Sequence, residues 1–148
     1  MCCNNNNSNN NNSRSTNCIA EILQVILVLQ QSACGPDTCL DSCDRPMLGC
    51  GTPINCNTRP VTIYTCCGNG TPWTMPTTRE ADCTATGETS CVFRIEKLDG
   101  NCATFRVLVP NTDTTSLCAF EGTDSFFTID CNCICAIKCL NDTCVDCL

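Results

Sequence analysis

The stretch CVFRIEKLDGNCATFRVLV, residues 91–109, decides the fold class because its two halves have the pattern of paired β-strands. Apolar and polar residues alternate along 91–98 and again along 102–109, which is the two-residue period of a half-buried strand. The sequence DGN between the halves favours a turn. The stretch therefore predicts an antiparallel hairpin.

The length of the loop decides which side chains of this hairpin share a face. A three-residue loop at 99–101 would place apolar residues opposite one another, in the pairs Ile95–Phe105 and Phe93–Val107. A two-residue turn at Asp99-Gly100 would mix apolar and charged residues on both faces. We therefore predict the three-residue loop, with Gly100 or Asn101 supplying its left-handed residue.

The same register brings two arginines together on the polar face of the hairpin. Arg94 lies opposite Arg106, and like charges at such positions repel each other unless an acid bridges them. Glu96 on the same face is the local candidate for that acid, and a carboxylate from another subunit is the alternative. A solvated outer face is the third interpretation.

Further strands are predicted on both sides of the hairpin. VTIYTC (61–66) alternates and precedes the turn-forming sequence CGNGTP, and FFTIDCNCIC (126–135) alternates into a cluster of cysteines. If the second segment is one extended strand, Cys131, Cys133 and Cys135 all point the same way. The predicted fold class is mainly β, an antiparallel β-sandwich-like domain with one N-terminal helix.

The N-terminal part of the chain divides into three segments. Residues 1–17 form an asparagine-rich arm with Cys2 and Cys3, which we expect to be flexible, either as a solvated tail or as a tether to a neighbouring subunit. Apolar residues at helical spacing after Asn17, a good N-cap, predict a helix over about 18–31. Residues 34–60 read as a cysteine-rich loop held by cross-links.

The length and charge of the chain narrow the possible classes of function. We expect residues 18–148 to form a single domain, with strands over 61–140 and a cysteine-bearing tail at 141–148. The formal charge of −7 argues against nucleic acid and anionic membranes as partners. The most apolar stretch, 19–31, is shorter than the roughly 20 residues that span a bilayer. The N-terminal sequence lacks the features of a signal peptide, so we expect synthesis in a cytoplasm followed by later oxidation.

Any function assigned to this chain has to account for its high cysteine content. The chain has 20 cysteines in 148 residues, above the roughly 8–10% typical of a disulfide scaffold, and no histidine. Without histidine, Cys–His catalysis is excluded, and we expect neither an enzyme nor a bound cofactor. The thiolates of 131–139 and 144–147 are spaced closely enough for a metal site, so a metal-binding protein is one alternative function. A compact disulfide-rich monomeric binding module is another.

Disulfide geometry favours partners that are distant in the sequence. Cysteines two apart in a strand are about 6.6 Å apart with roughly parallel side chains, which is poor geometry for a bond between them. The sulfurs of the cluster at 131–135 must then pair with another strand, a loop or another chain. An excess of cysteines on an arm and a terminal tail suggests cross-links between molecules.

Several segments together resemble a known family. NTRPVTIYT (57–65), CVFRIEKL (91–98), CATFRVL (102–108) and especially FFTIDCNCICAIKCL (126–140) are similar to the CotY/CotZ family of spore coat and exosporium proteins. The resemblance implies a structural protein, made in the mother-cell cytoplasm and self-assembled into a disulfide-cross-linked two-dimensional layer around the bacterial endospore. It also implies other coat or exosporium proteins as partners, besides further copies of the chain.

The cysteines expected to form bonds between subunits lie near the two ends of the chain. These candidates are Cys2, Cys3, Cys18, Cys131, Cys133, Cys135, Cys139, Cys144 and Cys147. Their individual pairings do not follow from the sequence, because even eight cysteines allow 105 connectivities.

Overall fold

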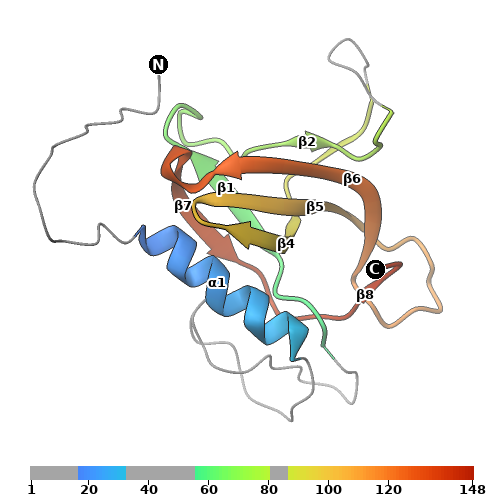
Figure 1. Cartoon of the computed structure of the whole chain (residues 1–148). Coiled ribbons are helices and arrows are strands. Elements are labelled where there is room, and N and C mark those ends of the chain that lie inside the picture. Colours follow the sequence, from blue (N-terminus) through green and yellow to red (C-terminus); the bar gives the residue numbers. More distant parts are fainter. Residues whose placement is uncertain (1–16, 33–55, 81–86) are drawn as a thin grey trace, which may run out of the picture.

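The computed structural model describes residues 17–32, 56–80 and 87–148, and within them the chain is mainly β (Figure 1). The predicted N-terminal arm, apart from Asn17, and nearly all of the predicted cysteine-rich loop lie outside the described residues. The elements are α1 (Cys18–Gln31), β1 (Val61–Thr65), β2 (Met75–Pro76), β3 (Thr89–Ser90), β4 (Phe93–Asp99), β5 (Cys102–Pro110), β6 (Phe120–Asp130), the 3-10 helix η1 (Cys131–Cys133), β7 (Ile134–Cys139) and β8 (Val145–Asp146).

The main sheet has six strands in the order β7-β1-β4-β5-β6-β8. Its described strand pairs are antiparallel except β6 with β8, which run parallel with Phe120 opposite Val145. A separate two-stranded sheet joins β2 to β3. The prediction of a mainly β domain with one N-terminal helix is confirmed, while the main sheet is mixed and a helix covers it (Figure 1).

A short connection forces the main sheet to curl. β6 and β7 follow each other in the chain, yet three strands lie between them in the sheet. In a flat sheet four strand spacings of about 4.8 Å would separate them by about 19 Å. The four steps from Asp130 to Ile134 span at most about 14 Å, so the end of β6 must bend towards β7.

The helix α1 covers one face of the curled sheet. Its N-cap is Asn17, whose side chain accepts hydrogen bonds from the backbone N–H groups of Ile19 and Ala20 at 3.0 and 3.3 Å. The predicted helix over 18–31 is confirmed. Its buried apolar residues pack against the apolar face of the sheet, and they are Ile19, Leu23, Ile26 and Leu27.

A buried amide fixes the C-terminal half of α1. The Gln30 side chain donates to the Ile95 carbonyl at 2.8 Å and accepts from the Arg59 backbone N–H at 3.2 Å. It therefore ties the helix both to β4 and to the segment before β1. Such pairing is what allows a polar amide to lie in the core.

The strands β4 and β5 pair in the predicted register, but the turn that joins them is shorter than predicted. Three predicted pairs are observed, Phe93–Val107, Arg94–Arg106 and Ile95–Phe105. The three-residue loop is wrong, because Asp99 pairs with Cys102 and leaves a two-residue turn with Gly100 at a φ of 58°. A β-bulge at Glu96, between Ile95 and Lys97, absorbs the extra residue and keeps the apolar face continuous.

The bulged residue also resolves the repulsion between the two arginines. The Glu96 carboxylate accepts from Arg94 Nη1 at 2.7 Å and from Arg106 Nε at 2.8 Å. The local candidate for the bridging acid is therefore confirmed. One carboxylate within the chain thus bridges the two arginines and offsets one of their two positive charges.

The predicted strand over 126–135 is wrong in its second half. β6 ends at Asp130, whose side chain accepts from the Asn132 N–H at 2.9 Å and starts the 3-10 turn. Cys131 is buried and Cys135 is exposed, so the three cysteines do not share one face. This local hydrogen bond ends the strand although the alternation of the sequence continues, and the chain then turns into β7.

Candidate cross-linking site

The described residues contain seven unpaired cysteines, and most of them lie at the surface. Cys131 is buried and Cys91 is half-buried. The other five are exposed, and they are Cys18, Cys66, Cys102, Cys135 and Cys147. They occur on α1, after β1, on β5, on β7 and after β8, so they are spread over several elements of the domain.

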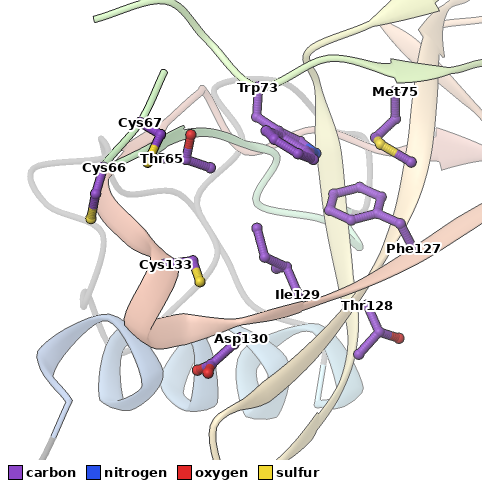
Figure 2. Close-up of a pocket in the computed structure, with 10 residues that line it drawn as sticks. All are labelled: Thr65, Cys66, Cys67, Trp73, Met75, Phe127, Thr128, Ile129, Asp130 and Cys133. Carbon is purple, nitrogen blue, oxygen red and sulfur yellow. The ribbon is translucent and has the colours of Figure 1, made fainter. Parts of the chain in front are cut away.

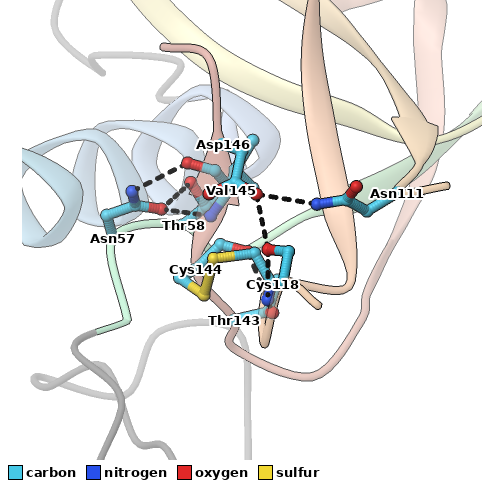
Figure 3. The surroundings of a disulfide bond; sticks show 9 residues. Asn57, Thr58, Asn111, Cys118, Thr143, Cys144, Val145 and Asp146 are labelled. Atoms are coloured by element: carbon cyan, nitrogen blue, oxygen red, sulfur yellow. Dashed lines mark hydrogen bonds between the residues drawn. A yellow bond between two sulfur atoms is a disulfide. The ribbon is translucent and has the colours of Figure 1, made fainter. Parts of the chain in front are cut away.

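One disulfide fastens the C-terminal tail to the segment just before β6. Cys118 and Cys144 are bonded at 2.05 Å, with their Cα atoms 4.9 Å apart (Figure 3). Around this bond the Asn57 side chain pairs with the backbone N–H and C=O of Val145 at 2.9 and 3.2 Å. The Asp146 carboxylate accepts from Asn111 at 2.7 Å. The expectation that Cys144 links subunits is wrong, because the tail folds back onto its own domain.

Two more candidates are already bonded inside the chain. Cys133 and Cys139 are disulfide-bonded, as are Cys56 and Cys67. The structure thus corrects the expectation that Cys133 and Cys139 bond to other subunits. Both lie where the curled sheet brings distant segments together, at the end of η1 and at the end of β7.

Cys131 is buried, and this burial excludes it from the candidate cross-linking cysteines. Its side chain is 0% exposed and belongs to the core beneath α1. Burial, with a smaller contribution from the charge of Asp130, raises the pKa of its thiol. A buried, protonated thiol cannot reach another chain, so the inter-subunit role predicted for Cys131 is wrong.

Three predicted candidates remain exposed and unpaired, namely Cys18, Cys135 and Cys147. Cys2 and Cys3 lie outside the described residues. Cys66 and Cys102 are exposed thiols that the sequence prediction missed. The hairpin pattern contained a signal for Cys102, because Ala103, Phe105 and Val107 point inward and place position 102 on the opposite face.

The C-terminal thiol lies in an acidic setting. Partial desolvation and then the nearby carboxylate of Glu121 raise the pKa of Cys147. Cys147 also has a φ of 60°, in the left-handed region. Its thiolate therefore forms at a higher pH than that of an ordinary cysteine, which slows its exchange reactions.

An apolar groove opens where β6 bends towards β7 (Figure 2). Its volume is about 450 Å³, and the large apolar side chains that line it are Trp73, Met75, Phe127 and Ile129. Cys66, Cys67 and Cys133 lie at its other end, near the last residue of β1. The phenyl ring of Phe127 packs edge-on against Phe93, with ring centroids 4.8 Å apart, which joins the groove to the core.

The described residues offer no other recognisable chemical site. Within 17–32, 56–80 and 87–148, no group of three or more Cys, Asp or Glu side chains is placed to hold a metal ion. In the same ranges, no helix is long and apolar enough to cross a membrane.

A family model described as Spore coat protein Z matches residues 4–119. The chain belongs to the spore coat protein Z family. The resemblance seen in the sequence is confirmed, and the match includes the segments 57–65, 91–98 and 102–108 but ends before 126–140. No curated protein and no solved structure matches the chain. Membership of this family supports a structural role in the spore coat and a place in the surface layer of the spore.

Proposed function

We propose that this chain self-assembles into a disulfide-cross-linked two-dimensional layer, coat or exosporium, around the bacterial endospore. The observation that carries the proposal is the presence of exposed, unpaired thiols on separate elements of the domain, namely Cys18 on α1, Cys102 on β5 and Cys147 after β8. A monomer with one free thiol could only form dimers, whereas several thiols on separate elements can join each copy to several neighbours.

The intramolecular bonds leave those thiols available for assembly. The bond between Cys118 and Cys144 fastens the tail, and Cys133 and Cys139 are bonded within the chain. Each such bond stabilises a fold by about 2–4 kcal/mol, so the domain is held together before any contact with a neighbour forms. The remaining surface thiols then serve to covalently fix contacts that have already formed.

Non-covalent contacts would first order the subunits. Within the described part of the chain β7 pairs only with β1, so its other edge is available to a strand of a second copy. Apolar side chains are also exposed at Leu117 (76%) and Phe126 (46%). Further coat or exosporium proteins would join the same layer, after synthesis in the mother-cell cytoplasm and oxidation at the end of sporulation.

Gel electrophoresis of the recombinant protein tests this function. With the exposed thiols oxidised, we expect a ladder of high-mass species on a non-reducing gel that collapses to the monomer under strong reductant. A variant with Cys18→Ser, Cys102→Ser and Cys147→Ser should lose most of the ladder, and Cys91→Ser, at a half-buried thiol, is the matched control. Wild-type protein that remains monomeric, or an unchanged ladder in the triple variant, would contradict the proposal. Electron microscopy of regular arrays would complete the test.

A further inference from the structure

Two of the exposed thiols, Cys66 and Cys135, lie next to each other at one end of the main sheet. We propose that they form an exchange site for disulfide substrates, in which both thiols react with one disulfide and close into a Cys66–Cys135 bond. The site is separate from the cross-linking thiols Cys18, Cys102 and Cys147.

The pairing of β1 with β7 brings the two cysteines together. Tyr64 lies opposite Ala136, but Thr65 lies opposite Ile134, so Cys135 is the extra residue of a β-bulge. The Cys66 N–H donates to the Cys133 carbonyl at 3.1 Å, which continues the ladder by one residue past the bulge. Bulges redirect a side chain at a sheet edge, and here the bulged residue is a thiol beside another thiol.

The two thiols also interact directly. A hydrogen bond between the Cys66 and Cys135 side chains is the main cause of a raised pKa at Cys135. An interaction between two thiols on or beside paired strands is the arrangement from which a disulfide between them can form. Both side chains are exposed, and Cys66 also lines the open groove, so an incoming disulfide can reach the Cys66 sulfur.

The reaction proceeds by two exchange steps. The Cys66 thiolate attacks one sulfur of the substrate disulfide, whose S–S bond breaks, and the other substrate sulfur leaves as a thiolate that takes up a proton. Cys135 then gives its proton to solvent and attacks the Cys66 sulfur, which expels the second substrate sulfur. The two protein thiols are oxidised to one disulfide, and the substrate is reduced to two thiols.

The proximity of Cys135 decides how long a bond between Cys66 and another molecule lasts. A tethered group close to its partner has an effective concentration of about 1 mM or more, well above that of another protein molecule in solution. A mixed disulfide at Cys66 is therefore resolved within the chain before a second chain attacks it. This last consequence rests on the layer proposed above. In such a layer, Cys66 and Cys135 would contribute little to permanent cross-links between subunits.

Peptide mapping after treatment with glutathione disulfide tests the exchange site. With about 0.1 mM glutathione disulfide, roughly a tenth of that effective concentration, wild-type protein should give a peptide pair joined by a Cys66–Cys135 bond. The Cys135→Ser variant should instead retain glutathione on Cys66, at a level at least about ten-fold above wild type. Cys102→Ser, the same change at another exposed thiol, is the matched control and should leave the Cys66–Cys135 bond intact.

Two results would overturn the inference. One is wild-type protein that keeps glutathione on both thiols, and the other is an equal level of glutathione on Cys66 in wild type and Cys135→Ser. Circular dichroism of each variant checks that the fold is retained. If no variant forms high-mass species but the Cys66–Cys135 bond still appears in the map, the layer proposal fails while the exchange site stands.

Discussion

Replacing Asp142 by asparagine should strongly destabilise the domain, because it removes a buried carboxylate that pairs with a buried guanidinium. Arg59 and Asp142 form an ion pair whose side chains are both 0% exposed. Arg59 Nε and Nη2 donate to the two carboxylate oxygens at 2.8 and 3.0 Å. Asparagine keeps the shape but loses the charge and turns an N–H₂ group towards the guanidinium. Breaking a buried pair in this way costs about 3–5 kcal/mol.

Urea unfolding of the oxidised protein measures this cost. For a chain of this size the slope is about 2 kcal/mol per M, so the midpoint should fall by about 1.5–2.5 M in Asp142→Asn. The same chemical change at an exposed position, Asp124→Asn on β6, is the control and should leave the midpoint nearly unchanged. A decrease of less than about 0.5 M in Asp142→Asn would refute the reasoning, because it would mean that the charge of Arg59 is compensated without Asp142.

Three further outcomes follow from the packing and the thiol environments. Leu23→Ala removes a side chain that is 0% exposed beneath the helix, and it should lower the free energy of unfolding by about 2–5 kcal/mol in the same assay. Iodoacetamide at pH 8 should alkylate the exposed Cys18 before the buried Cys131, whose pKa is raised by burial, and mass mapping would detect the reverse order if this is wrong. Glu121→Gln removes a carboxylate that helps to raise the pKa of Cys147, so the pH at which Cys147 is half-maximally alkylated should decrease. An unchanged pH profile would show that desolvation and the charge of Asp146 raise this pKa without Glu121.

The register of the central hairpin was predictable because both of its strands have one buried face. Phe93, Ile95, Phe105 and Val107 specify which side points inward, and this pattern tolerates only one alignment. The turn was not predictable from the same pattern. A bulge at Glu96 and a three-residue loop satisfy the apolar face equally well, and the observed bulge also places the Glu96 carboxylate between two arginines.

The end of the last long strand shows where alternation fails as a signal. The apolar and cysteine residues of 126–135 keep a period of two, yet the Asp130 side chain caps a turn at Asn132. A short polar side chain that bonds the backbone two residues ahead can end a strand without any change in the hydrophobic pattern. The turn moves Cys131 into the core and Cys135 to the surface.

The sequence by itself determined that the domain is mainly β with one capped helix, and that its lack of histidine excludes Cys–His chemistry, because these properties depend on composition and local periodicity. Only the tertiary structure decided which sulfurs are bonded, buried or exposed. Cys118 and Cys144 are 26 residues apart, and Cys66 meets Cys135 across two strands that are neighbours only in the folded sheet. Whether a thiol can react depends on what the fold places within a few ångströms of it, and spacing along the chain does not contain that information.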